Sequence, residues 1–120
     1  MARLEELIAW QRAPALADSV YRATAIGEFD QDRRLRDQMR SAAVSVASNI
    51  AEGHGRGGRK EFARFLQISV GSCAELRTQV YIAGRSGTLP PAWSGALLAD
   101  CAEVSGLVSR LRAAVRRQKD

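Results

Sequence analysis

The stretch of the sequence with the clearest chemical pattern is the glycine-rich segment Gly53-His54-Gly55-Arg56-Gly57-Gly58. It satisfies the string G-x-G-x-x-G, which binds dinucleotide phosphates when it joins a strand to a helix. Here a helical pattern precedes it, and Arg59-Lys60-Glu61 follows where a Walker A loop needs Lys and a hydroxyl residue. Two interpretations stay open: backbone N–H groups and flanking cations that bind an anion, or a hairpin tip with solvated charges.

No other set of side chains has the spacing of a catalytic or metal site. His54 is the only histidine, so a Ser-His-Asp set would have to use it at a glycine-rich tip, where we expect nothing nearby to fix its tautomer. Glu52, Glu61 and Glu75 could act as paired carboxylates, but metal sites in helical bundles use Glu-x-x-His repeats, which this sequence lacks. We therefore expect no enzymatic activity, no bound metal and no cofactor.

Arginine dominates the charge of the chain. Eighteen basic against thirteen acidic residues give a net charge of +5, and sixteen of the basic residues are arginine, which pairs bidentately with phosphate or carboxylate. Residues 1–58 are balanced at eight against eight, whereas residues 59–120 carry ten against five. Two clusters account for the excess and are the candidate nucleic-acid-binding residues: Arg56, Arg59, Lys60 and Arg64, and then Arg110, Arg112, Arg116, Arg117 and Lys119. They either complement helix ends or bind phosphate.

The elements that must position these clusters are helices. Apolar residues recur at steps of four and three, the heptad rhythm of left-handed helix packing, and no segment alternates every two residues as a half-buried strand does. The seams are Leu35, Met39, Ala42, Val46 and either Asn49 or Ile50, then Phe62, Leu66, Ser69, Cys73, Leu76, Val80 and Ala83, then Leu97, Cys101, Val104, Val108, Leu111 and Val115. We predict one all-α domain over 1–120, an antiparallel up-down-up-down four-helix bundle with helices at roughly 10–26, 30–53, 58–86 and 90–117.

Proline, aspartate and glycine residues indicate where the helices begin and end. Proline is tolerated in the first turn of a helix, so Pro14 predicts a start near Trp10, with Leu4, Leu7 and Ile8 as an apolar leader packed across the bundle. Asp30 is the expected N-cap of the second helix. Gly87 suits a left-handed cap for the third, and Pro90-Pro91 suits the start of the fourth.

Composition indicates a soluble globular protein, because 46% of residues are hydrophobic and 26% are charged. No apolar run approaches the roughly 18–20 residues that span a bilayer, and no leader resembles a secretion signal, so we expect a cytoplasmic protein. Cys73 and Cys101 lack a C-x-x-C spacing and are interpreted as small core residues.

Apolar residues also lie away from the seams, at Val44, Ile50, Phe65, Ile68, Val70, Tyr81 and Ile82. Either the helical phase is assigned too loosely, or this second stripe is covered by another copy of the chain. Polar residues near the inward face, Asn49, Glu52, Ser72, Glu75 and Gln79, are expected to bond to one another or to Arg40 and Arg64, because an unpaired buried polar group is costly. The alternative is a functional polar pocket.

Three strings carry a family resemblance: Ser45-Val46-Ala47-Ser48-Asn49-Ile50-Ala51-Glu52-Gly53-His54-Gly55-Arg56, Lys60-Glu61-Phe62-Ala63-Arg64-Phe65-Leu66, and Gly71-Ser72-Cys73-Ala74-Glu75-Leu76 with Gln79. Together with the opening Leu7-Ile8-Ala9-Trp10-Gln11-Arg12-Ala13 and Val20-Tyr21, they resemble the four-helix-bundle family of 23S ribosomal-RNA intervening-sequence proteins. The accessory variability proteins of diversity-generating retroelements belong to the same group. The sequence departs from the pattern at Ala47, where proline is common, and at Gly57-Gly58, where a hydroxyl or larger residue is usual.

The resemblance implies a basic bundle that assembles into a ring-shaped homopentamer, and for retroelement members it implies binding of nucleic acid and of a reverse transcriptase. The shared motif residues are interpreted as helix-hairpin architecture: Ser48, Asn49, Glu52, Gly53, Gly55, Phe62, Phe65, Gly71, Ser72 and Glu75. The leading hypothesis is a non-enzymatic oligomer that binds the RNA or DNA backbone, as an accessory factor to a reverse transcriptase in the retroelement case. The alternative is a protein-interaction scaffold with no nucleic-acid ligand.

Overall fold

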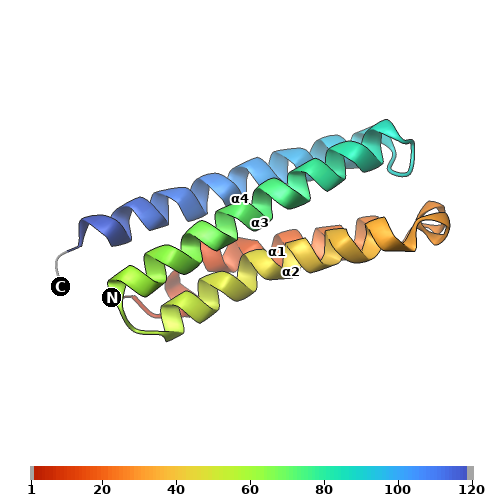
Figure 1. Cartoon of the computed structure of the whole chain (residues 1–120). Coiled ribbons are helices and arrows are strands. Elements are labelled where there is room, and N and C mark those ends of the chain that lie inside the picture. The colour runs from red at the N-terminus through yellow and green to blue at the C-terminus, as the bar shows by residue number, and fades with distance from the viewer. Residues whose placement is uncertain (1, 119–120) are drawn as a thin grey trace.

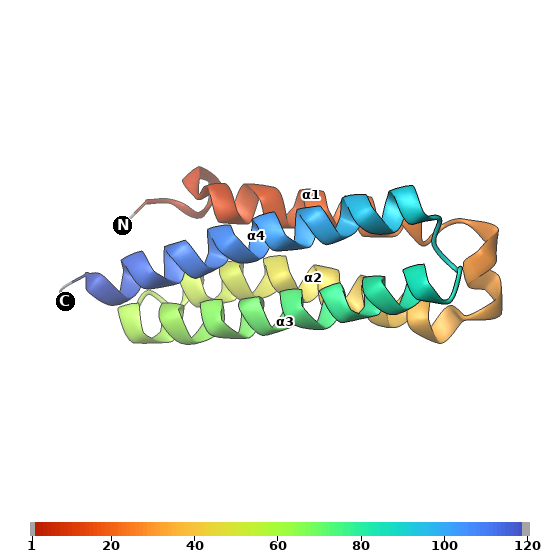
Figure 2. The same ribbon diagram turned by 90° about the horizontal axis from the view of Figure 1, so that it is seen from above.

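The computed structural model describes residues 2–118, without the side chain of Glu5, and consists of four long α-helices that run antiparallel to their neighbours (Figure 1). They are α1 (Ile8–Ala23), α2 (Arg33–Gly55), α3 (Arg59–Arg85) and α4 (Pro91–Arg117), with short 3-10 helices at Leu4–Glu6 and Gly27–Gln31. The described part contains no strand, which confirms the predicted all-α class. Viewed from above, α1 lies beside α2 and α4, and α3 lies beside the same two helices, in a rod of 50 × 20 × 20 Å (Figure 2).

The predicted heptad seams form the core of this rod. The buried members are Leu35, Met39, Ala42, Val46 and Ile50 on α2, Phe62, Leu66, Ser69, Cys73, Leu76, Val80 and Ala83 on α3, and Leu97, Cys101, Val104, Val108 and Val115 on α4. Leu111 is partly buried against them. Removing one Val, Leu, Ile or Phe side chain from water is worth about 1.5–3 kcal/mol, so these seams hold the four helices together.

Helix α1 differs from its prediction. It begins at Ile8 and ends at Ala23, so Pro14 is its seventh residue and lies in the helix interior rather than in the first turn. The reason is packing: a buried stripe of Ala9, Ala13, Leu16 and Val20 faces the core from the first turn onward. The burial of this stripe outweighs the one backbone hydrogen bond that Pro14 cannot donate. Leu4 and Leu7 pack on the core as expected, whereas Ile8 is 61% exposed.

The start of α2 also lies later than predicted. The 3-10 helix Gly27–Gln31 buries Phe29 completely, which takes up the chain between α1 and α2. Asp30 lies within this short helix, and Asp32 is the N-cap, because its carboxylate accepts a hydrogen bond from the Leu35 N–H at 3.1 Å. Two other predicted helix ends are confirmed. Pro90 is the N-cap of α4 and Pro91 its first residue, and Gly87 after α3 has the left-handed φ of 82°.

The second apolar stripe is correct only in part. Phe65 was expected to point away from the seam, and Ile50 was assigned to the second stripe as well as being a candidate for the seam; both are buried. The reason is the α2–α3 hairpin, whose helices approach closely enough at Gly53 for Phe65 to pack between them. Val70 is partly buried against the core. The members that remain exposed are Val44, Ile68, Tyr81 and Ile82.

Two features are not found in residues 2–118. None of their helices has the length and apolar content needed to cross a membrane. The same residues contain no group of three or more His, Cys, Asp or Glu side chains placed to hold a metal ion.

Candidate nucleic-acid interface

The two arginine clusters meet at one end of the bundle. Because α3 and α4 are antiparallel, the first residues of α3 lie beside the last residues of α4 (Figures 1 and 2). Two arginine side chains cross between the helices: an Arg59 guanidinium nitrogen donates to the Arg116 carbonyl at 3.4 Å, and Arg112 Nε donates to the Ala63 carbonyl at 3.3 Å. Eight predicted cations therefore lie at the same end of the bundle, here called the basic end: Arg56, Arg59, Lys60, Arg64, Arg110, Arg112, Arg116 and Arg117. The ninth, Lys119, lies outside the described residues.

Carboxylates offset part of this charge. Arg56 pairs with Glu52, and Arg64 pairs with Glu61, each at an N–O distance of 3.0 Å. All four side chains are about half exposed, so each pair contributes little to stability. The other basic-end cations besides Arg59 have no carboxylate partner within residues 2–118; they are Lys60, Arg110, Arg112, Arg116 and Arg117.

An aromatic ring fixes the two paired arginines. The Arg56 guanidinium lies 5.1 Å and the Arg64 guanidinium 4.5 Å from the centroid of the Phe65 ring. Both contacts are within the range of a cation–π interaction. Phe65 therefore connects the end of α2 to the start of α3 through side chains as well as through the turn, and Arg56 and Arg64 serve the hairpin more than an external ligand.

His54 joins the N-terminal segment to the same hairpin. Its Nε2 lies 2.8 Å from the Ala2 carbonyl oxygen, which accepts a hydrogen bond and so requires the proton on Nε2. Its ring packs edge-on against Phe62 at 5.6 Å between centroids. The sequence predicted that nothing would fix the tautomer of His54; this was wrong, because the partner lies more than fifty residues away in the chain. The same contact places Arg3, which belongs to neither predicted arginine cluster, near the basic end, where it pairs with Glu6 at 3.4 Å.

The polar residues of the hairpin bond in a pattern different from the expected one. Ser45 lies at its centre: its hydroxyl is 2.8 Å from the Ser72 hydroxyl, and Asn49 Nδ2 donates to its carbonyl at 2.8 Å. Ser69 donates to the Val46 carbonyl across the same helix pair at 2.8 Å. The expected partner Arg40 donates instead to the Thr24 hydroxyl at 2.8 Å. The Gln79 carbonyl oxygen is buried without a hydrogen-bond partner among the described residues.

Small residues let α2 and α3 approach, and Gly53 shows it most clearly. A Cβ at Gly53 would lie 2.6 Å from the Phe65 Cβ, whereas a Cβ at Gly55 or Gly71 would meet nothing within 4 Å. Of the three motif glycines, only Gly53 is required by packing.

The fold and this surface define a class: a four-helix bundle with an electropositive end. The sequence of the chain matches the family described as 23S rRNA-intervening sequence protein over residues 5–110, and the chain belongs to that family. A solved structure from Bacteroides thetaiotaomicron VPI-5482, described as a protein with unknown function from the S23 ribosomal protein family, has the same fold with a TM-score of 0.79. It is 14% identical, and the alignment covers 88% of this chain and 98% of that one. No curated protein matches the chain. The retroelement branch of the resemblance stays a prediction.

Proposed function

We propose that the chain is a non-enzymatic protein that binds the sugar-phosphate backbone of RNA or DNA through its basic end, and that it acts as a homo-oligomer. The observation that carries this proposal is that two sequence-distant arginine clusters lie at one end of the bundle, where five cations lack a carboxylate partner in the described part of the chain. The name of the family, 23S rRNA-intervening sequence protein, supports an RNA-related role.

Backbone recognition predicts a particular salt dependence. Each phosphate that is neutralised by a cation releases a counterion, so the affinity falls steeply with salt and depends little on base sequence. Arginine suits this role because its planar guanidinium can bond two phosphate oxygens at once. An enzyme would need a positioned nucleophile or base, and the side chains of the basic end supply cations instead.

The test removes three exposed cations, Arg110, Arg116 and Arg117, by substitution with Gln. Fluorescence anisotropy with labelled RNA, measured over a range of salt concentrations, should show weaker binding. The slope of log affinity against log salt should become shallower by about 0.7–0.9 for each lost phosphate contact.

A matched control removes the same charge from the opposite end of the rod. Arg22, Arg33 and Arg34 are exposed near the end of α1 and the start of α2. Their substitution with Gln should leave the salt slope nearly unchanged. Equal affinity and equal slope for both triple variants would show that the basic end does not bind nucleic acid.

Exposed apolar residues support the oligomer. Val44, Ile68 and Ile82 are between 41% and 50% exposed on the outward faces of α2 and α3. A second copy that covers these side chains would remove them from water and would place several basic ends in one body, which strengthens binding to a polyanion through multivalency.

The genes beside this one distinguish two roles for such a nucleic-acid-binding protein: an accessory role in a retroelement and a role linked to a ribosomal RNA gene. A reverse transcriptase with template and variable repeats nearby would support an accessory role in a retroelement. A position within a ribosomal RNA gene would support the intervening-sequence branch and remove the reverse transcriptase as a partner.

A further inference from the structure

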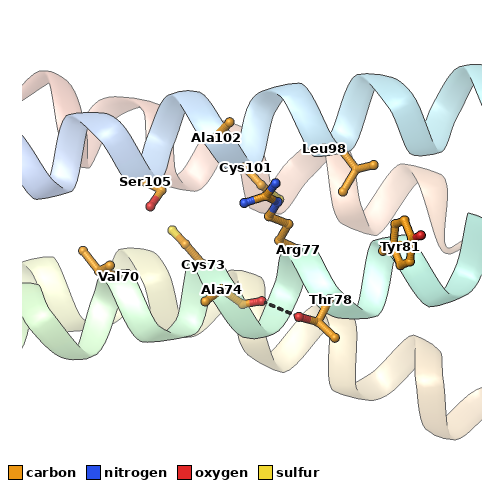
Figure 3. Close-up of a pocket in the computed structure, with 10 residues that line it drawn as sticks. All are labelled: Val70, Cys73, Ala74, Arg77, Thr78, Tyr81, Leu98, Cys101, Ala102 and Ser105. Carbon is orange, nitrogen blue, oxygen red and sulfur yellow. Dashed lines mark hydrogen bonds between the residues drawn. The ribbon is translucent and has the colours of Figure 1, made fainter.

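A groove of about 740 Å³ runs between α3 and α4, away from the α2–α3 hairpin (Figure 3). Its walls are apolar for most of their length, with polar groups at intervals. The residues that line it are Val70, Cys73, Ala74, Arg77, Thr78 and Tyr81 on α3, and Leu98, Cys101, Ala102 and Ser105 on α4. The heptad spacing does not point to this surface, because only its two cysteines belong to the seams, whereas Val70 and Tyr81 belong to the second apolar stripe.

The charge in the groove has one sign. Arg77 is the single charged side chain among the described residues that line it, and it forms no ion pair within residues 2–118. The hydroxyls of Thr78 and Ser105 lie along the same walls (Figure 3). Tyr81, which is 54% exposed, stands at the end of the groove near Leu98. A ligand here meets one cation, several hydroxyls, an aromatic ring and an apolar floor.

This groove continues the seam that the basic end occupies. Arg112 and Arg59 bridge α3 and α4 at the basic end, and Arg77 lies between the same two helices farther along. From Ala63, whose carbonyl Arg112 holds, to Arg77 is about four helical turns, or roughly 21 Å. The α3–α4 seam therefore carries cations at the basic end and again, about four helical turns farther along, at Arg77.

We propose that a single strand of nucleic acid leaves the basic end and lies in the α3–α4 groove, with a backbone phosphate at Arg77 and a base stacked on Tyr81. This inference rests on the proposed function and adds to it a ligand class. The groove offers one cation and one exposed aromatic ring, which fit one phosphate and one unpaired base. In a duplex the bases are stacked on one another and have no free face for Tyr81, whereas the bases of a single strand do. Aromatic stacking beside a cationic track is the way proteins hold single strands without reading their sequence.

Two substitutions test the groove, Arg77→Gln and Tyr81→Ala. Both side chains are exposed, so neither variant should lose the fold, and thermal unfolding checks this. The probe is a labelled single-stranded oligouridine, with a duplex RNA of the same length measured in parallel. Tyr81→Ala should weaken binding of the single strand on the order of tenfold. Arg77→Gln should make its salt slope shallower by about 0.7, and duplex binding should stay unchanged for both variants.

The chain offers matched controls for both substitutions. Tyr21 is an exposed tyrosine on α1 with Arg40 over its ring at 4.6 Å, much as Tyr81 has Arg85 over its ring at 5.8 Å. Arg33 is an exposed arginine outside the groove. Tyr21→Ala and Arg33→Gln should leave oligouridine binding as it is. Photocrosslinking with 4-thiouridine in the oligouridine should label the peptide that contains Tyr81.

The outcomes separate this inference from the proposed function. If oligouridine binding depends on Arg110, Arg116 and Arg117 and ignores the two groove variants, the groove inference is wrong and the proposed function stands. If neither single strand nor duplex binds the wild type, the proposed function fails, and the groove inference fails with it. An acidic helical peptide that binds in an Arg77-dependent manner, while oligouridine does not, would assign the groove to a protein partner and would overturn the inference.

Discussion

Gly53 is the residue on which the close approach of α2 and α3 depends. An added methyl group would lie 2.6 Å from the Phe65 Cβ and 3.2 Å from a ring carbon of Phe62. Neither aromatic side chain can withdraw, because both are buried. We expect Gly53→Ala to lower the free energy of unfolding by about 1–3 kcal/mol, the usual cost of overpacking a core. Urea denaturation followed by circular dichroism measures the change.

Gly55 provides the control for this prediction. It is the last residue of α2, and a Cβ there would meet nothing within 4 Å. Gly55→Ala should therefore raise the free energy of unfolding by up to about 1 kcal/mol, because alanine has the higher helix propensity. If both variants were stabilised equally, the tight contact at Gly53 would be contradicted.

The two cysteines make stability depend on pH in the alkaline range. Burial raises the pKa of the Cys73 thiol from its ordinary 9.0 to about 11; burial, with smaller contributions from Cys73 and Asp100, raises that of Cys101 to about 12. Below pH 9 both states of the protein keep these thiols protonated, so their contribution to stability is fully present. Above pH 9 only the unfolded chain ionises them, and this contribution is lost as the pH rises through 11 and 12.

The measurement compares wild type with a Cys73→Ala, Cys101→Ala double variant under reducing conditions. Between pH 9 and pH 11 the free energy of unfolding of the wild type should fall more steeply than that of the double variant. Parallel curves would mean that the thiols titrate alike in the folded and unfolded states.

At the scale of the element, α1 lacks one backbone hydrogen bond because of a proline. Pro14 lies in the helix interior, where it cannot donate a hydrogen bond to the carbonyl of Trp10. Pro14→Ala should restore that bond and raise the free energy of unfolding by about 1–3 kcal/mol. Thermal and urea unfolding test this. A loss of stability would show that the proline shapes α1 to its neighbours and that its ring packing is worth more than the missing bond.

Some features of the helices could be predicted from the sequence, and others could not. The α3 and α4 seams were predictable because the spacing of Leu97, Cys101 and Val104 is a local property of the chain. Phe65 was misassigned because its burial depends on how closely a second helix approaches at Gly53, which spacing within one helix does not encode. The start of α1 was misplaced because a penalty at Pro14 was weighed without the buried stripe that offsets it.

At the scale of the whole molecule, the basic end was half predictable. An up-down-up-down topology already implies that the start of α3 and the end of α4 share one end, so the two arginine clusters could have been joined from the sequence. The contact between His54 and the Ala2 carbonyl could not, because no local pattern links two segments so far apart in the chain. Arg77 could have been found as the cation that follows Val70 by two helical turns beside the α3 seam.

Self-association is the prediction that depends on the molecule as a whole. Ile68 and Ile82 are four turns apart on one face of α3, and both are exposed, as is Val44 on α2. This face is distinct from the α3–α4 groove, so oligomer formation and strand binding can be tested separately.

Analytical ultracentrifugation at micromolar concentration should show a defined oligomer. An Ile68→Lys, Ile82→Lys variant should dissociate this oligomer while circular dichroism stays unchanged. Ile8→Lys, a change at an isoleucine of α1 that is 61% exposed, should leave the oligomer intact. A folded wild type that sediments as a single copy would show that the exposed apolar face has no second copy to cover it, and that each basic end must bind its ligand alone.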